Sequence, residues 1–308
     1  MQKTRIAIVG LGKIARDQHI PSLAASEAFE LVAVASPHHS LDGVPSFTSL
    51  EALLDAVPDV AAVSLCTTPQ VRYDIARLAL QQGCHVLLEK PPGVTVSEVH
   101  ALADLAQERG VVLFASWHSR FAPGVEPARV WLAERKILSI TVTWKEDVRT
   151  WHPGQRWIWQ AGGLGVFDPG INALSILTQI IPGALALKGA ELSYPSNCQT
   201  PIAARLVLAD ERGATAQVEL DFLQRGPQIW SIDVDTDAGR LSLSLGGKVL
   251  TLDGAAVGVA QNTEYANLYA HFAALLRRRS SDVDSTPLQL VADAFLCGRR
   301  VEVAPFIE

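Results

Sequence analysis

The sequence predicts an α/β protein with two domains: a doubly wound parallel sheet first, then an α+β domain with a largely antiparallel open sheet. Over the first third of the chain, short apolar runs alternate with helix-like patterns. After residue 200, several strand-like runs follow one another with only short turns between them. The length of 308 residues exceeds the roughly 250–300 residues at which a single core stops growing.

The first third predicts a parallel sheet because its apolar runs are continuous, as expected of strands buried on both faces. Helix signals stand between these runs. The pairs Thr48 with Glu51 and Thr95 with Glu98 match the capping box, and Gly110 marks the end of the second helix. The predicted strands are Ile6–Val9, Leu31–Ala35, Val60–Cys66, Val86–Leu88 and Val111–Ala115.

The rest of the chain predicts helices and consecutive strands that form an antiparallel meander. The expected strands are 140–144, 203–208, 215–222, 229–236, 240–245 and 248–252, and the expected helices are 125–135, one beginning at Pro169, 265–279 and 287–300. We therefore expect a first domain at residues 1–118 and a second at 119–308, whose C-terminal helix can pack back on the first domain.

Composition and spacing exclude several classes of protein. The net charge of −6 argues against a nucleic-acid-binding surface, which needs clustered Lys and Arg. The four cysteines are far apart, and the histidines form no HxH or HExxH pattern. There is no signal-peptide layout and no run of about 18 apolar residues. We expect a cytoplasmic protein without membrane association or a metal site.

The turn Gly10-Leu11-Gly12-Lys13-Ile14-Ala15 has the pattern G-x-G-x-x-A, directly after the first strand and at the start of a helix. In this context it predicts a site for a dinucleotide pyrophosphate, which the helix N-terminus attracts. The second strand ends in Ser36-Pro37-His38-His39 rather than in the Asp or Glu that holds the ribose of NAD. Because Ser36 and His38 are compatible with a 2′-phosphate, we predict that NADP or NAD binds, with either dual use or a preference for NADP.

Glu89-Lys90-Pro91 follows the strand Val86–Leu88, at the carboxyl edge of the sheet, where ligands of open α/β folds bind. A lysine fixed at a strand end can stabilise an oxygen on which negative charge develops. Pro91 is a candidate for a cis peptide bond. The alternative is a surface lysine beside a proline turn, but the position of Lys90 favours a catalytic role.

Asp168 and Asn172 stand at the expected start of a helix, with Asp168 as the N-cap and Pro169 at the first helical position. Because they are four residues apart, their side chains should share one helix face. The simpler interpretation makes Asp168 only a cap. The glycines at 162, 163 and 165, which permit close backbone approach, favour a functional carboxylate.

The segment from Trp144 to Trp159 holds four of the seven tryptophans of the chain, among charged residues. Rigid aromatic faces beside polar groups suit a pyranose, whose apolar C–H patches are ringed by hydroxyls. The segment is therefore predicted to contribute to a sugar site.

Together, the Gly10–Ala15 turn, Glu89-Lys90-Pro91 and Phe167–Ala173 resemble the Gfo/Idh/MocA oxidoreductase family, whose first domain is a Rossmann fold. Segments 117–120, 144–147 and 151–155 resemble its L-arabinose 1-dehydrogenase and D-galactose 1-dehydrogenase group. The chain departs from the patterns at two positions. Asn172 stands where many family members have His, and Pro37 stands where that group can have Arg.

The resemblance implies site residues and a homodimer or higher homo-oligomer. The implied catalytic residues are Lys90, Asp168 and Asn172. The implied cofactor contacts are Gly10, Gly12, Lys13, Ile14, Ser36, His38, Cys66, Thr67, Thr68, Gln70, Glu89 and Lys90. The implied sugar contacts are His118, Glu146, Trp151, His152, Asp168, Asn172 and Trp230.

The function implied is NAD(P)-dependent oxidation of the C1 hydroxyl of an aldopyranose, such as L-arabinose or D-galactose, to the 1,4- or 1,5-lactone by hydride transfer. Asp168 would accept the hydroxyl proton and Lys90 would stabilise the oxygen. A rival assignment makes Lys90 the base and Asp168 the group that tunes it. Other functions left open are oxidation of another sugar or polyol carbon, a non-catalytic NAD(P)-binding sugar sensor, and a glycosidase that uses bound NAD transiently.

Overall fold

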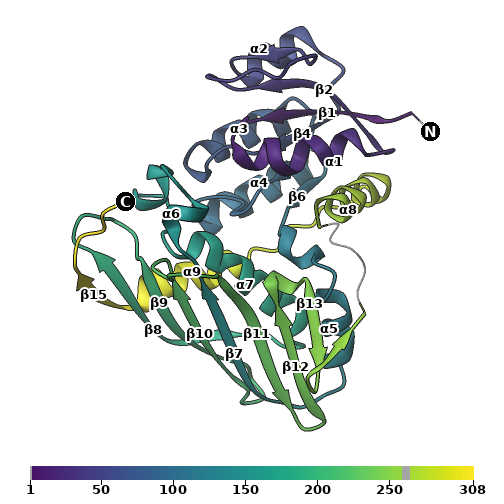
Figure 1. Cartoon of the computed structure of the whole chain (residues 1–308). Coiled ribbons are helices and arrows are strands. Elements are labelled where there is room, and N and C mark those ends of the chain that lie inside the picture. Colours follow the sequence, from purple (N-terminus) through teal and green to yellow (C-terminus); the bar gives the residue numbers. More distant parts are fainter. Residues whose placement is uncertain (1, 259–263) are drawn as a thin grey trace. The chain divides into compact units, whose positions relative to one another are not determined.

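The structure is a computed structural model that describes residues 2–258 and 264–308. The chain divides into two compact units, whose elements are labelled in Figure 1. The first unit comprises Met1–His118 and Tyr265–Ser285, and the second comprises Ser119–Glu264 and Thr286–Glu308. Among the described residues, no helix is long and apolar enough to cross a membrane.

The first unit is built on six parallel strands in the order β3-β2-β1-β4-β5-β6. They are β1 Thr4–Val9, β2 Phe29–Ala35, β3 Ser46–Phe47, β4 Ala62–Leu65, β5 His85–Leu88 and β6 Leu113–Ala115. The helices of this unit are α1 Ile20–Ala24, α2 Leu50–Ala56, α3 Pro69–Gln81, α4 Val96–Arg109 and α8 Glu264–Arg278. This strand order is that of the Rossmann fold, so the predicted doubly wound sheet is confirmed.

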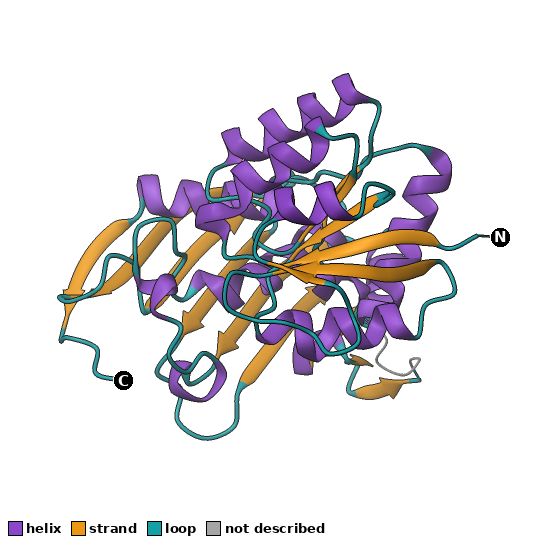
Figure 2. Cartoon of the chain, turned by 90° about the horizontal axis from the view of Figure 1, so that it is seen from above, coloured by secondary structure: helices purple, strands orange, loops and turns teal. Residues whose placement is uncertain are grey.

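Helices cover both faces of this sheet because alternate side chains of each strand point to opposite sides (Figure 2). On one face, Val63 and Leu65 belong to the core formed with α2, α3 and α4. On the other face, the Ser64 hydroxyl lies 3.3 Å from the Tyr269 hydroxyl of α8. Helix α8 therefore supplies part of the cover on this face, beside His19 of the first helix, which also contacts Ser64.

The helix signals in this unit were predicted correctly at α4 and one residue off at α2. Thr95 and Glu98 form the capping box, and Gly110 ends α4 in the left-handed conformation. The Thr48 capping box is wrong, since Ser49 is the N-cap of α2 and its side chain accepts the N–H of Ala52. Both hydroxyl residues suit an N-cap, so the sequence alone does not separate the two positions.

The second unit is built on nine strands in the order β14-β13-β12-β11-β7-β10-β9-β8-β15. They are β7 Ile137–Lys145, β8 Ala186–Pro195, β9 Ala203–Ala209, β10 Thr215–Asp221, β11 Ile229–Thr236, β12 Gly239–Ser244, β13 Val249–Leu252, β14 Ala255–Val257 and β15 Arg299–Val303. Its helices are α5 Val125–Leu132, α6 Val148–Trp151, α7 Phe167–Ile180 and α9 Thr286–Cys297.

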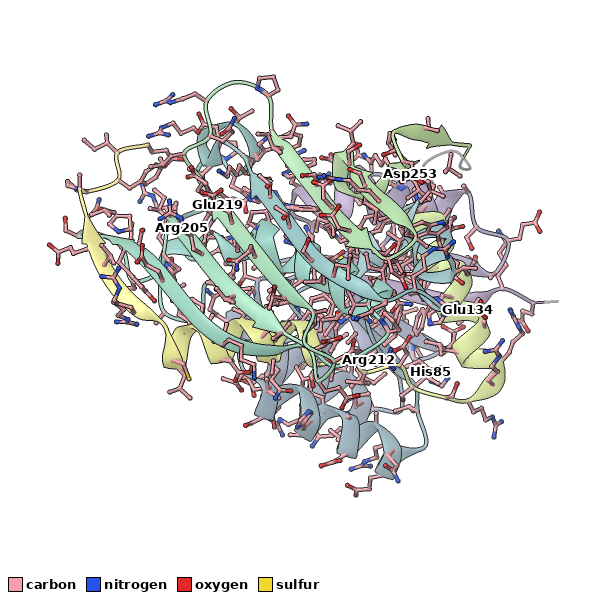
Figure 3. The ribbon with its side chains drawn as sticks, turned by 90° about the horizontal axis from the view of Figure 1, so that it is seen from below. His85, Glu134, Arg205, Arg212, Glu219 and Asp253 are labelled. Atoms are coloured by element: carbon pink, nitrogen blue, oxygen red, sulfur yellow. The ribbon has the colours of Figure 1, made fainter. Side chains whose placement is uncertain are left out.

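The two faces of this sheet differ. Along β7, the buried Ile140, Val142 and Trp144 alternate with Thr141 and Thr143, which are more accessible, and α5, α7 and α9 pack against the sheet (Figure 1). The other face carries charged pairs. Figure 3 shows one of them, Arg205 and Glu219, which are register partners on β9 and β10.

The prediction of a largely antiparallel sheet is confirmed, but the simple meander is wrong. Strand β7 lies between β10 and β11 and pairs with β10 in parallel. Strand β15 also pairs in parallel, with β8, and neither of these two strands was predicted. The predicted helix 287–300 ends at Cys297, so Arg299 and Arg300 begin β15.

Candidate active site

Three predicted cofactor residues lie together where strands of the first sheet end. Each continues the ladder by one backbone hydrogen bond: Gly10 N–H to the Ala35 carbonyl, Cys66 N–H to Val9 and Glu89 N–H to Leu65. The strand order reverses between β1 and β4, and the crevice at such a switch point is where open α/β sheets bind ligands. Gly10 and Cys66 stand at this point.

The two glycines of the turn have different tasks. Gly10 has φ +94°, and a Cβ there would lie 2.8 Å from backbone atoms of Cys66 and Thr67. Its need for glycine therefore comes from the chain itself. A Cβ at Gly12 would meet no protein atom within 4 Å. The helix then begins at Lys13, where first-turn N–H groups lack intrahelical acceptors, so this turn fits a pyrophosphate.

The helix after the turn contains a π-helical turn, Ala15–His19, that continues into α1. Within this turn the exposed Arg16 guanidinium donates to the Ser40 carbonyl at 3.2 Å. It thus lies beside the segment that begins with Ser36. The sequence analysis missed Arg16, because a contact across 24 residues leaves no local signal.

The remaining predicted cofactor residues sit at the ends of the same strands. Ser36 is 8% exposed and follows β2, while His38 is exposed in the segment beyond it. Lys13 forms an ion pair with Asp17 on its own helix. Thr68 is the N-cap residue of α3, and Gln70 lies exposed in the first turn of that helix.

Lys90 is half-buried, and its peptide bond with Pro91 is cis, as predicted. The preceding carboxylate holds its backbone: the Lys90 N–H donates to Glu89 Oε2 at 2.7 Å. Glu89 Oε1 accepts the Tyr265 hydroxyl at 2.7 Å and lies 3.1 Å from His19 Nε2. The Glu89 side chain is therefore engaged by protein groups on both oxygens.

His19 and Glu89 form a buried ion pair. Burial lowers the pKa of His19, but Cys66, Tyr269 and Glu89 raise it by more, so the pKa lies well above the usual value. Burial raises the pKa of Glu89, but the hydrogen bond and charge of His19 outweigh this effect and hold the pKa well below its usual range. Both groups are thus charged at neutral pH, and Glu89 also accepts the backbone N–H of Lys90.

Arg72 of α3 ties together two of the strand-end loops. Its buried guanidinium donates to the carbonyls of Thr67, Glu89 and Pro91. The sequence analysis missed Arg72 too, although a signal exists. It lies on the helix stripe that buries Ala76 and other small apolar residues, where an arginine is out of place unless its charge is hydrogen-bonded.

In the second unit, an imidazole stands between two buried carboxylates. His152 Nε2 lies 2.9 Å from Glu146 Oε1, and His152 Nδ1 lies 3.6 Å from Asp168 Oδ2. Trp230 Nε1 donates to Glu146 Oε2 at 2.9 Å. Glu146 and Asp168 are only 2% and 3% exposed. Four residues predicted to contact a sugar are thus brought together.

These residues lie on or directly after four elements, β7, α6, α7 and β11. Glu146 follows β7 and is anchored by its N–H to the Asp221 carbonyl at 2.9 Å. Asp147 is the N-cap residue of α6, and His152 is its C-cap residue. The exposed Trp151 of this helix meets the ring of Trp230, with centroids 4.8 Å apart. An aromatic wall therefore adjoins the polar cluster, as a pyranose site requires.

The expected position of Asp168 in its helix is corrected. The N-cap of α7 is Val166, so Asp168 is the second helical residue, in the first turn. Asn172 lies one turn further along α7, half-buried. The close approach permitted by the glycines is to the chain itself: a Cβ at Gly163 or Gly165 would lie 2.3 Å from the carbonyl of Trp157 or Pro201.

His118, the remaining predicted sugar contact, belongs to the first unit, where its ring stacks on Tyr265 with centroids 5.3 Å apart. Lys90 belongs to the same unit, whereas Asp168 and Asn172 belong to the second. Within the described ranges, no group of three or more His, Cys, Asp or Glu side chains could hold a metal ion.

A Rossmann sheet with a glycine turn and a lysine at a strand end, followed by a second domain with a buried carboxylate, defines a nicotinamide-dependent oxidoreductase. Comparison with known proteins agrees. Residues 4–116 match the family model described as oxidoreductase family, NAD-binding Rossmann fold. The chain is 46% identical to galactose 1-dehydrogenase of Pseudomonas fluorescens over the whole of both chains. The chain belongs to this Gfo/Idh/MocA oxidoreductase family.

Solved structures support the same conclusion. The crystal structure of D-galactose-1-dehydrogenase from Rhizobium etli has a TM-score of 0.96 and 52% identity, covering 100% of this chain and 99% of that one. A 3-ketoreductase from Actinomadura kijaniata, solved with NADP, has a TM-score of 0.85 at 20% identity, covering 98% and 100% of the two chains. At this identity the second likeness supports the fold alone.

Proposed function

We propose that the protein oxidises the C1 hydroxyl of an aldopyranose to the lactone, with D-galactose and L-arabinose as the sugars to test first. The observation that supports this most is the buried Asp168 carboxylate beside His152, Glu146 and the tryptophan wall. The full-length likeness to galactose 1-dehydrogenase supports the choice of sugar. L-Arabinose has the same ring configuration and lacks only the hydroxymethyl group.

Bound NADP or NAD would supply the acceptor for the hydride that leaves C1. Asp168 would take the proton of the C1 hydroxyl, and Lys90 would stabilise the oxygen as negative charge develops on it. Asn172, one turn beyond Asp168 on α7, would orient the sugar. His118, Glu146, Trp151 and Trp230 would line the sugar site.

Both dinucleotides are proposed as cofactors. The segment Ser36–Ser40 contains no carboxylate that would repel a 2′-phosphate, and Arg16 brings a cation to it. The contacts expected for the pyrophosphate come from Gly12, Lys13 and Ile14. The homo-oligomer and the cytoplasmic location stay predictions, and sedimentation of the purified protein tests the first.

A panel of aldoses with NAD and with NADP tests the proposal, with absorbance of the reduced nicotinamide as the readout. D-Galactose or L-arabinose should give turnover, and the product should be a lactone that hydrolyses to the aldonic acid. A keto sugar as product would indicate oxidation of another carbon. Dinucleotide binding without turnover of any sugar would indicate a sensor.

Two variants test the roles of the residues. Asp168→Ala should abolish turnover with modest loss of cofactor binding, because the base is removed while the first unit is unchanged. Lys90→Met should slow turnover by about 10²-fold or more, as expected for loss of a group that stabilises an oxyanion. Near-normal turnover of Asp168→Ala would eliminate Asp168 as the base and favour Lys90.

A further inference from the structure

The arrangement around His152 goes beyond a sugar pocket. The imidazole has a carboxylate at each nitrogen: Glu146 Oε1 at 2.9 Å from Nε2, and Asp168 Oδ2 at 3.6 Å from Nδ1. Gln155 Oε1 lies 3.5 Å from the same Nδ1. Both ring nitrogens of His152 therefore face acceptor oxygens.

The short contact fixes the tautomer of neutral His152. An ionised carboxylate only accepts hydrogen bonds, so Nε2 carries the hydrogen that points to Glu146. The other Glu146 oxygen accepts Trp230 Nε1–H at 2.9 Å, which holds the carboxylate in place. Nδ1 is then the nitrogen with the lone pair, and it faces Asp168. It is ready to take a proton that Asp168 gives up.

Burial creates a need for such a step. Oxidation of an alcohol with hydride transfer sets one proton free for each sugar oxidised. Asp168 is 3% exposed, so a proton on its carboxyl group has little direct contact with water. The His152 side chain is 16% exposed and contacts both Asp168 and the medium. The imidazole is thus placed between the buried base and the solvent.

We infer that His152 acts through Asp168 as a proton relay, which receives on Nδ1 the proton that Asp168 takes from the C1 hydroxyl and passes it to water. Glu146, held by Trp230, positions the imidazole and balances the charge of the protonated ring. The inference rests on the proposed function, because it needs Asp168 to be the base. The balance is complete: the hydride leaves C1 for the bound nicotinamide, and the proton leaves through Asp168 and His152.

The test is chemical rescue of His152→Ala, measured as steady-state oxidation of D-galactose, or of the aldose that the panel selects. The variant should lose about 10²-fold in kcat, within the range for general acid–base catalysis. The sugar KM should change less than about threefold, since the group acts after binding. Added imidazole should raise the kcat of His152→Ala at least about tenfold, with a saturable dependence on imidazole concentration, because a small base can occupy the space left by the ring.

Two further variants make the result decisive. His100→Ala, an exposed histidine of the first unit, should keep full activity and show no response to imidazole. His152→Gln can still donate a hydrogen bond to Glu146, and its kcat should fall by the same factor as that of His152→Ala. This variant replaces His152→Ala in the test if the alanine variant does not fold. A rise in KM without loss of kcat, or no response of His152→Ala to imidazole, would overturn the relay.

Asp168→Asn separates the relay from the proposed function. If this variant has no turnover while His152→Ala is normal, Asp168 remains the base and the relay is wrong. If Asp168→Asn turns over normally, the base assignment itself is wrong, whatever His152 does.

Discussion

Replacing His19 with leucine should destabilise the protein strongly, because it leaves Glu89 charged, buried and without its cation. His19 is fully buried, Glu89 is 2% exposed, and Nε2 lies 3.1 Å from Oε1. At an effective dielectric constant of about 20, two unit charges at this separation attract by about 5 kcal/mol. Breaking one side of a buried pair costs about 3–5 kcal/mol. We therefore expect His19→Leu to lower the free energy of unfolding by about 3–5 kcal/mol near pH 6.

The loss should depend on pH in a defined direction. The pKa of His19 is raised in the folded protein, so its contribution is complete below the unfolded value of about 6.5. It decreases as the pH rises above that value and is lost above the folded pKa. The pKa of Glu89 is lowered, so its contribution is present above its unfolded value of about 4.3 and is lost as the pH falls through the folded pKa. The difference in free energy of unfolding between wild type and variant should therefore be largest between about pH 4.3 and about pH 6.5, the two unfolded pKa values.

Urea unfolding, followed by circular dichroism at pH 6 and pH 9, measures both effects. The double variant His19→Leu with Glu89→Leu should lose less than the sum of the single variants, because no unpaired charge remains. His100→Leu, at an exposed histidine of the same unit, should change the free energy of unfolding by less than about 0.5 kcal/mol. A loss for His19→Leu below about 1 kcal/mol that is the same at both pH values would refute the ion pair.

Three further predictions concern the first unit. Gly10→Ala should lower the free energy of unfolding, measured in urea, by more than about 2 kcal/mol, because its Cβ would lie 2.8 Å from backbone atoms at φ +94°. Gly12→Ala should leave the free energy of unfolding nearly unchanged but weaken cofactor binding, measured by dinucleotide fluorescence, about tenfold or more. Arg16→Ala should raise KM for NADP more than KM for NAD, and equal changes would contradict a phosphate contact. Arg72→Met should lower the free energy of unfolding by at least about 3 kcal/mol in urea, because three carbonyls lose their donor, and Arg72→Lys should recover only part of it.

Features set by neighbouring residues could be predicted from the sequence. The capping box of Thr95 and Glu98 depends on four residues, and the cis bond before Pro91 depends on a residue type with a known preference. The same locality explains the error at α2, where Thr48 and Ser49 both suit the cap.

Features set by distant partners could not be predicted. Strand β15 begins with two arginines after a helix, and it becomes a strand because β8, over 100 residues earlier, pairs with it. Tyr265 and Tyr269 belong to the first unit because their hydroxyls complete a network with Glu89 and Ser64, which no local pattern records.

The candidate site also combines features that the sequence indicates with features that depend on residues far apart in the chain. The family resemblance implied Glu146, His152 and Asp168 as separate members of a sugar pocket. Their order in space, with the imidazole between the two carboxylates, depends on how β7, α6 and α7 meet. The chemistry of each side chain could be inferred from its residue type, whereas the proposed route of the proton depends on distances that only the structure gives.

The three hydrogen bonds of Arg72 have a consequence for protein engineering. One planar cation fastens the loop that carries Thr67 to the carbonyls of Glu89 and Pro91, the residues before and after Lys90. A change of sequence in the Thr67 loop, made to alter cofactor binding, would therefore also shift the residue that faces the reacting oxygen in our proposal. Transplanting that loop between relatives should succeed only when the guanidinium and all three carbonyls move together.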